Sequence, residues 1–301
     1  MKGESNDDQL LPNARAALEL RDQERILFMP QPHWIGYTRS KEILARLEAL
    51  LRHPTTHRMP NLLIIGETNN GKTMLVRRFA KLHPIQENAE GQNTIVPVLL
   101  IQAPPVPDEG RFYNMLLEAL HAPYRPNESV AKKHLQVTKI LQSVQLRMLI
   151  IDEIHHLLAG SLAAQHRFLN VLKYLGNDLQ IPIVGVGTVE AIRAVAADPQ
   201  TKSRFEPVVL KRWELDRDFL SLLASFEKLI PLREASGLAD QHLALKLLSM
   251  SEGTIGELNG LLAFGTERAI QIGRERIDVP LLRGLDWVPP SERGRHAAGM
   301  V

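Results

Sequence analysis

The chain has 301 residues, of which 44% are hydrophobic, so it can form one large domain or two smaller ones with a sizeable core. It contains no cysteine, which excludes disulfides, thiolate metal sites and cysteine nucleophiles and suits the reducing cytoplasm. The formal net charge of +2 does not indicate a nucleic-acid partner, so any basic surface must be local. No signal peptide and no apolar run of the ~20 residues that span a bilayer is found, so we expect no membrane partner.

The first part of the chain is predicted to be an extension that leads into an amphipathic helix. Residues 13–28 have helical spacing, and two prolines within residues 29–34 indicate an extended linker. Residues 38–51 place five apolar side chains on one helix face, with Thr38 as the expected N-cap.

Residues 66–73 match the phosphate-loop pattern G-x-x-x-x-G-K-[ST] in full. A buried strand is predicted directly before this segment and a helix directly after it. The glycines let the backbone curl so that its N–H groups face phosphate oxygens, and the positive end of the helix faces the same anion. Lys72 can then reach the β- and γ-phosphates, and Thr73 can bind Mg²⁺. The expected phosphate-binding residues are Gly66, Glu67, Thr68, Asn69, Asn70, Gly71, Lys72 and Thr73.

The middle of the chain alternates predicted strands and helices, which indicates a mainly parallel five-stranded sheet with helices on both faces. After the strand at residues 61–65, further strands are expected over residues 95–101, 148–152, 181–186 and 208–210. Pro97 within the second strand would demote it to an edge or irregular strand, because proline cannot donate to the sheet.

The pattern changes after Trp213, where helical periodicity continues without strands and indicates a smaller all-helical domain. The segment from Asp278 has three prolines and few periodic apolar residues, so we expect a loosely ordered tail. The expected parts are an N-terminal extension (1–33), an α/β nucleotide-binding domain (34–212), a helical lid domain (213–277) and a C-terminal tail (278–301).

Two carboxylates, Asp152 and Glu153, follow the apolar strand at residues 148–151. Asp152 could hold Mg²⁺, and Glu153 could orient and deprotonate an attacking water. An amphipathic strand that ends in a solvated acidic turn would have the same sequence, but the preceding phosphate loop favours a nucleotide site. Glu153 favours an ATPase over a kinase, because a kinase needs its base beside the acceptor hydroxyl.

Two more polar residues lie near strand ends. Thr188 follows the fourth strand and is a candidate sensor of the γ-phosphate; a helix N-cap, with Glu190 in the next turn, is a compatible second role. Arg204 precedes the last strand, where ring-forming ATPases send an arginine into the neighbouring site, although a solvated loop arginine would look the same. His155 and His156 suggest a metal site, but no third ligand is evident, so a cap or interface role is the simpler interpretation.

With these motifs the chain resembles the AAA+ ATPases, and more closely the TniB family of transposition ATPases, which are relatives of TnsC and MuB. The resemblance runs from about Pro30 to Ile272. Its motifs are Trp34–Tyr37, Arg58–Gly66, Asn69–Thr73, Ile151–Leu157 and Gly185–Thr188.

The resemblance implies ATP and Mg²⁺ as cofactors, and it implies roles for several residues. Arg204 matches the arginine finger that acts in trans, and Gln102 matches a polar residue that restrains the catalytic glutamate. The segment Gly253–Glu257 lacks the lid arginine of many AAA+ proteins, so slow hydrolysis is expected. The residues expected to line the adenine pocket are Trp34, Ile35, Gly36 and Tyr37.

The resemblance further implies a homo-oligomeric ring or helical filament on double-stranded DNA, which recruits a DDE transposase and could engage a target-selection adaptor. Such DNA contacts go to phosphates without base readout. The candidates are Arg111, Lys132, Lys133 and Lys139, although a solvated helix surface has the same composition. An assembly ATPase that acts on a protein partner is the alternative. A small-molecule phosphoryl transferase is a third one, which Glu153 and the helical lid disfavour.

Overall fold

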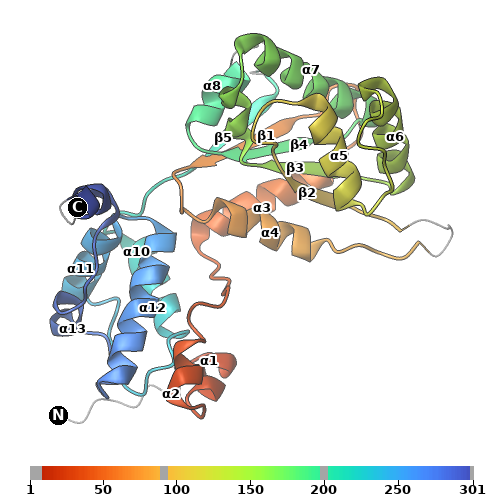
Figure 1. Ribbon diagram of the computed structural model, residues 1–301. Helices are drawn as coiled ribbons and strands as arrows, with labels where there is room; N and C mark the ends of the chain where they lie inside the picture. The colour runs from red at the N-terminus through yellow and green to blue at the C-terminus, as the bar shows by residue number, and fades with distance from the viewer. Residues whose placement is uncertain (1–8, 89–93, 197–202, 299–301) are drawn as a thin grey trace. The chain divides into compact units, whose positions relative to one another are not determined.

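The computed structural model describes residues 9–88, 94–196 and 203–298. The chain forms two compact units, shown in Figure 1. The α/β unit consists of Arg39–Lys211, and the helical unit consists of Met1–Thr38 together with Arg212–Val301. Within the described residues, no helix is both long and apolar enough to cross a bilayer.

The α/β unit is built on a five-stranded sheet with the strand order β2-β3-β4-β1-β5, in which every neighbouring pair is parallel. This confirms the predicted fold class. β2 begins after Pro97 and forms an edge of the sheet, as the proline predicted. The strands are β1 (Asn61–Gly66), β2 (Val98–Gln102), β3 (Met148–Asp152), β4 (Ile183–Gly187) and β5 (Phe205–Leu210).

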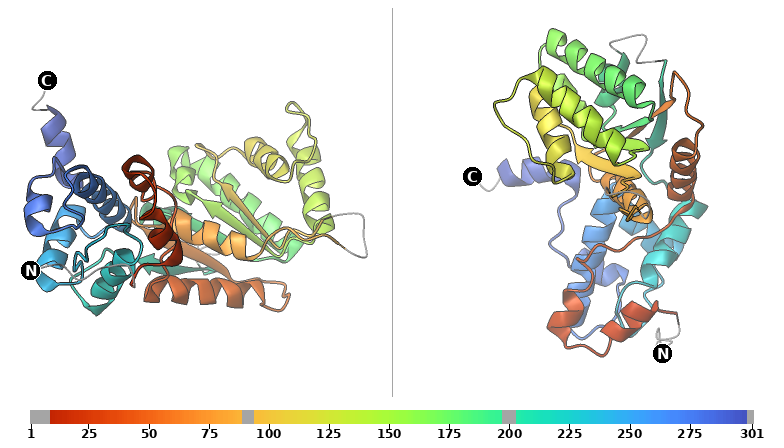
Figure 2. Two further views of the ribbon diagram at one scale, coloured as in Figure 1. Left: turned by 90° about the horizontal axis from the view of Figure 1, so that it is seen from below. Right: turned by 90° about the vertical axis from the view of Figure 1, so that its right-hand side faces the viewer.

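Helices cover both faces of this sheet, with α3 and α4 on one face and α5, α6 and α7 on the other (Figures 1 and 2). Because both faces are covered, the inner strands are continuous apolar runs, and all five positions of β3 are buried. Phe112 of α5 and Phe168 of α7 pack edge to face in this core, with ring centroids 5.0 Å apart. The helices are α3 (Thr38–Leu51), α4 (Lys72–Leu82), α5 (Glu109–Ala119), α6 (Val130–Ser143), the 3-10 helix η1 (Ile154–Ala159), α7 (Leu162–Leu179) and α8 (Glu190–Ala196).

The helical unit has its own core, formed mainly by side chains of α10, α11 and α12. Its α-helices are α1 (Pro12–Ala17), α2 (Asp22–Ile26), α10 (Arg217–Glu227), α11 (Gln241–Ser251), α12 (Ile255–Gln271), α13 (Val279–Arg283) and α14 (Arg293–Ala298), with the 3-10 helix η2 (Pro290–Glu292). The N-terminal extension belongs to this unit, because Met29 is buried in the same core.

A buried ion pair also ties the extension to the helical unit. The Arg25 guanidinium is 1% exposed and lies 2.6 Å from the Glu275 carboxylate, and it also donates to the Pro231 carbonyl at 2.9 Å. Burial alone would raise the pKa of Glu275, but hydrogen bonds from Arg25 and from the Arg233 backbone outweigh it and lower this pKa below its ordinary value. Removing only one partner of such a buried charge pair strongly destabilises the fold, because the other charge stays buried without compensation.

The expectation of a loosely ordered tail was wrong for its first part. Asp278 caps α13 by accepting a hydrogen bond from the Leu281 backbone at 2.9 Å, and Leu281 and Leu282 are buried. Pro280 lies in the first turn of α13, where its missing N–H has no intrahelical partner to lose. Proline here starts a helix rather than breaking one.

Candidate nucleotide-binding and hydrolysis site

The phosphate loop lies at the carboxyl end of β1 and leads into α4, as the sequence predicted. A Cβ at Gly66 would lie 2.8 Å from the Leu210 carbonyl oxygen, so only glycine permits this approach to β5. Gly71 has a φ of +81°, which glycine adopts without strain. The Asn70 side chain donates to the carbonyls of Leu210 at 3.0 Å and Lys211 at 2.9 Å. The end of β5 therefore fixes the shape of the loop.

Lys72, Thr73 and Asp152 come together at this edge of the sheet. Lys72 is buried, and its ammonium donates to the Glu67 carbonyl at 2.6 Å. The Thr73 hydroxyl donates to Oδ2 of Asp152 at 2.7 Å, which joins the start of α4 to the end of β3. Burial lowers the pKa of Lys72, while the carboxylates of Glu153, Asp152 and Glu67 oppose this shift. A bound triphosphate would favour the charged ammonium still further.

Glu153 follows β3 in a left-handed conformation with a φ of +56°. Its backbone N–H donates to Oδ1 of Asp152 at 2.9 Å, and its Oε2 lies 3.3 Å from Nε2 of His155. Sequence reasoning missed this contact with His155. Gln102 is exposed and lies opposite Asp152 in the β2–β3 pairing, so its restraining role stays a prediction.

Thr188 directly follows β4, which lies between β3 and β1. The strand order therefore places Thr188 between the ends of the two motif strands, which is the position that a γ-phosphate sensor needs. Glu190 lies in the first turn of α8, and the Thr188 hydroxyl holds the pKa of the Glu190 carboxyl below its usual range. Among the described residues the buried Thr188 hydroxyl accepts no backbone hydrogen bond from α8, so the cap role is not seen, and the sensor role stays a prediction.

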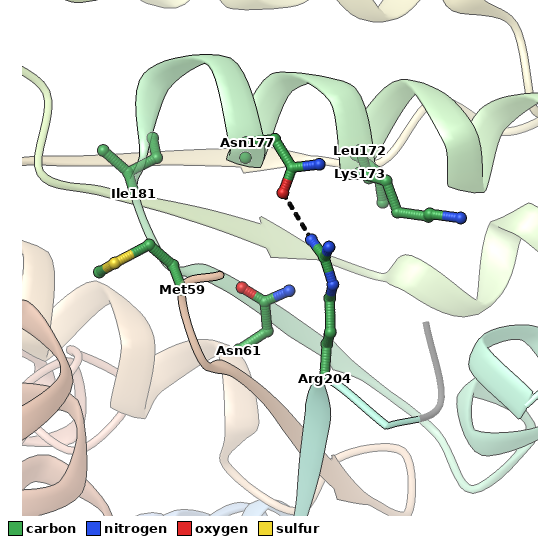
Figure 3. Close-up of a pocket in the computed structure, with 8 residues that line it drawn as sticks. Met59, Asn61, Leu172, Lys173, Asn177, Ile181 and Arg204 are labelled. Atoms are coloured by element: carbon green, nitrogen blue, oxygen red, sulfur yellow. Dashed lines mark hydrogen bonds between the residues drawn. The ribbon is translucent and has the colours of Figure 1, made fainter. Parts of the chain in front are cut away.

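Arg204 lies at the amino ends of the strands, opposite the ends that carry the phosphate loop. It precedes β5, and its carbonyl accepts a hydrogen bond from the Asn61 backbone at the start of β1. Figure 3 shows its guanidinium directed toward Asn177 at the end of α7, to which it donates at 2.6 Å. The side chain lines a small cavity there and is half-buried, unlike a solvated loop arginine. The phosphate loop lies beyond the other end of β1, roughly 17 Å away at about 3.3 Å per residue. Arg204 therefore cannot reach its own subunit's phosphate loop in this fold.

The expected adenine-pocket segment belongs to the helical unit. There the Tyr37 ring packs edge to face on Trp213, with centroids 4.9 Å apart, and Ile35 packs against the core. The role of Trp34, Ile35, Gly36 and Tyr37 in adenine binding stays a prediction. The segment Gly253–Glu257, which contains no arginine, leads into α12, and its Glu257 forms an ion pair with Arg293.

The DNA candidates differ in accessibility. Arg111, Lys132 and Lys139 are exposed, and Lys132 also pairs with Glu128 at 3.2 Å. Lys133 is only 5% exposed, and its ammonium donates to the Pro126 carbonyl at 2.6 Å. Lys133 therefore holds the loop before α6, and its buried ammonium is not available to a DNA phosphate, contrary to the prediction. The starts of α5 and α6 are neighbours, because a Cβ at Gly110 would lie 3.7 Å from the Val130 side chain.

Three solved structures resemble the chain at low sequence identity. The Aeropyrum pernix ORC2 protein, in ADPNP–ADP complexes, is 18% identical with a TM-score of 0.61, and the match covers 86% of this chain and 70% of that one. Cdc6p from Pyrobaculum aerophilum is 18% identical with a TM-score of 0.58 and coverages of 86% and 68%. The Aeropyrum pernix ORC1 protein, in complex with DNA, is 17% identical with a TM-score of 0.54 and coverages of 90% and 69%.

These likenesses confirm the AAA+ fold, and at such identities they show the fold alone. No curated protein sequence matches the chain. A family model, described as the bacterial TniB protein, matches residues 25–215. This match spans well over half of the chain, which therefore belongs to the TniB family of AAA+ ATPases.

Proposed function

We propose that this protein is a cytoplasmic, Mg²⁺-dependent ATPase that assembles on duplex DNA and recruits a DDE transposase to a target during transposition. The observation that carries the ATPase assignment is the convergence of Lys72, Thr73, Asp152 and Glu153 at one edge of the sheet. Membership of the TniB family supports the transposition part. A target-selection adaptor is a further candidate partner.

The donor set fits ATP and Mg²⁺. The buried Lys72 ammonium and the N–H groups at the start of α4 suit phosphate oxygens, and the oxygens of Thr73 and Asp152 suit Mg²⁺, which prefers hard ligands. When bound, Mg²⁺ neutralises part of the charge on the phosphates. The Glu153 carboxylate orients the attacking water and accepts its proton at an Oε atom. We expect slow turnover, because the segment Gly253–Glu257 contains no arginine of its own.

Assembly is part of the proposal because of where Arg204 lies. A guanidinium that cannot reach its own phosphate loop can still serve the loop of a neighbouring subunit, where it would stabilise charge on the transferring phosphoryl group. The hydrogen bonds to Asn61 and Asn177 hold Arg204 at the edge that such a neighbour would meet. We therefore propose a homo-oligomeric ring or filament.

We propose that Arg111, Lys132 and Lys139 contact DNA phosphates and that Lys133 does not. The three side chains are exposed, and the neighbouring starts of α5 and α6 place Arg111 and Lys132 at the same edge of the unit. Contacts of this kind neutralise phosphates, so the affinity for DNA should fall steeply with salt and depend little on sequence.

The test is duplex binding with and without ATP, measured across a range of salt concentrations. In the variant Lys132→Ala with Lys139→Ala, the slope of log affinity against log salt should fall by about 0.9 for each DNA phosphate that a subunit no longer neutralises. The exposed Lys81 of α4 lies on the other face of the sheet, so Lys81→Ala is the matched control and should keep the slope.

An unchanged slope in the double variant would show that α6 faces solvent. ATP-stimulated binding of a protein partner without any response to DNA would replace the proposal by the assembly-ATPase alternative. Retention of the cognate transposase on the DNA-bound protein, only when ATP is present, tests the recruitment step separately.

A further inference from the structure

The turn after β3 brings together three side chains that can bind a metal ion. Glu153, His155 and His156 each offer a ligand atom, and these atoms all lie within 4.8 Å of one another. Oε2 of Glu153 is already 3.3 Å from Nε2 of His155, and the two imidazole centroids are 5.0 Å apart. The sequence offered only the two histidines, so the structure supplies the third ligand.

Contacts within the described part of the fold account for only one of the two nitrogens of the His155 ring. Its Nδ1 is buried without a hydrogen-bond partner among the described residues, although buried polar atoms are normally satisfied. Its side chain instead directs Nε2 toward the Glu153 carboxylate, and both side chains keep partial exposure, at 25% and 34%. An ion from solvent can therefore reach the pair.

His156 has the outer contact that is typical of a metal-binding histidine. Its Nδ1 lies 3.5 Å from the Ala103 carbonyl oxygen. A proton on Nδ1 shared with that carbonyl leaves the lone pair on Nε2 for a metal ion, which is the usual arrangement around metal-bound imidazoles.

The donor set selects the class of metal. Two imidazole nitrogens and one carboxylate oxygen suit Zn²⁺ and similar divalent transition metals, with water as the fourth ligand, whereas Mg²⁺ prefers oxygens alone. Tetrahedral ligands about 2.0–2.1 Å from zinc lie roughly 3.3 Å apart. Glu153 and His155 already have this separation, so only the His156 ring would need to move inward.

We propose that Glu153, His155 and His156 form an inhibitory site for a divalent transition-metal ion. A carboxylate that binds the ion no longer accepts a proton from water, so the occupied site stops ATP hydrolysis. This inhibitory effect rests on the proposed role of Glu153 as the base, whereas metal binding itself does not.

The binding test uses the full chain without a polyhistidine tag. Zn²⁺ affinity is measured by competition with a chromogenic chelator, and Co²⁺ absorption reports the geometry of the bound ion. His156→Asn keeps an amide donor near the Ala103 carbonyl but removes Nε2, and it should weaken Zn²⁺ binding at least about tenfold. His166→Ala, at an exposed position on α7, is the control and should bind as tightly as the wild type. Equal affinity in all three proteins, or no binding by the wild type, would overturn the proposal.

The activity test adds Zn²⁺ to ATP hydrolysis in excess Mg²⁺, with each protein normalised to its zinc-free rate. The zinc concentration for half inhibition should be at least about tenfold higher for His156→Asn than for the wild type. Inhibition of both proteins at the same concentration would mean that zinc acts at Thr73 and Asp152 instead, which also refutes the site. If the wild type does not hydrolyse ATP, the proposed function fails while the binding test still decides on the metal site.

Discussion

Arg204→Ala tests whether hydrolysis needs two subunits. In the β1–β5 pairing, Asn61 lies opposite Phe205 and Gly66 lies opposite Leu210. Arg204 precedes this paired segment and the phosphate loop follows it, so the two are separated by roughly 17 Å along the sheet. The variant should therefore bind ATP as a monomer with near-normal affinity, because Arg204 reaches no phosphate within its own subunit.

The rate of ATP hydrolysis by the assembled Arg204→Ala variant should fall much more than its affinity for ATP. An arginine supplied to the transferring phosphoryl group is worth about 10³-fold or more in rate, which is at least about 4 kcal/mol of transition-state stabilisation. Arg204→Lys keeps the charge but loses the planar fork, so it should recover only part of this rate. Steady-state ATP hydrolysis and titration with a fluorescent ATP analogue measure the two effects separately.

Mixing with Glu153→Gln decides whether the arginine acts in trans. The Glu153→Gln subunit has no base but keeps Arg204, so it can complete the site of an Arg204→Ala neighbour. In an equimolar random assembly, about a quarter of the head-to-tail interfaces combine an intact base with an intact arginine. Turnover should rise toward that fraction of the wild-type rate. No rescue at any mixing ratio, with mixed assembly confirmed, would refute the reasoning.

Three further predictions follow from single contacts. Lys72→Ala should abolish tight ATP binding and DNA assembly together, at a cost of several kcal/mol, and normal nucleotide affinity in a titration would contradict this. Glu153→Gln should bind ATP, hydrolyse it at least about a hundredfold more slowly and form longer-lived DNA complexes, whereas wild-type turnover would remove Glu153 from the mechanism. Glu275→Gln should destabilise the helical unit by about 3 kcal/mol at neutral pH, because it leaves the buried Arg25 with only the exposed Asp22 as a charged partner. Since the pKa of Glu275 lies below its ordinary value of 4.5, its ion pair stabilises the fold above about that pH and this contribution is lost as the pH falls through the lowered pKa. All three tryptophans belong to the helical unit, so their fluorescence during denaturant unfolding measures this difference, which should shrink in acid.

Contiguous motifs were predictable because their chemistry is local. The phosphate loop needs glycine at set positions, and the Gly66 and Gly71 geometries bear this out. The apolar run that ends in Asp152 likewise forms a buried strand. Pro97 predicted an edge position for β2, because proline has no N–H to donate to a neighbouring strand. In contrast, the order of the strands depends on long-range packing that no local pattern contains.

The sequence predictions that were wrong or incomplete also concern contacts that depend on the folded chain. Lys133 looked like its neighbour Lys132, and only the fold brings the Pro126 carbonyl to its ammonium and buries it. The contact between Glu153 and His155 depends on the left-handed backbone at Glu153 and the 3-10 turn that follows, neither of which the spacing of the two residues shows. Pro280 contributed to the expectation of a loosely ordered tail, because the hydrogen bond by which Asp278 caps α13 becomes evident only in the folded chain.

The placement of the two halves of the site limits the symmetry of an assembly. Thr73, Asp152 and Glu153 lie at the carboxyl edge of the sheet and Arg204 lies at the amino edge, so each subunit presents the site with one surface and the arginine with another. A two-fold dimer joins identical surfaces, whereas the proposed action of Arg204 in trans joins two different surfaces and requires a head-to-tail interface. Repeating that interface yields a ring when the rotation closes and a helical filament when it does not. In a ring every site receives an arginine, but in a filament the site at one end has no neighbour to supply it. In the proposed assembly hydrolysis is therefore a property of the interface, and nucleotide at the open end of a filament would be retained longest.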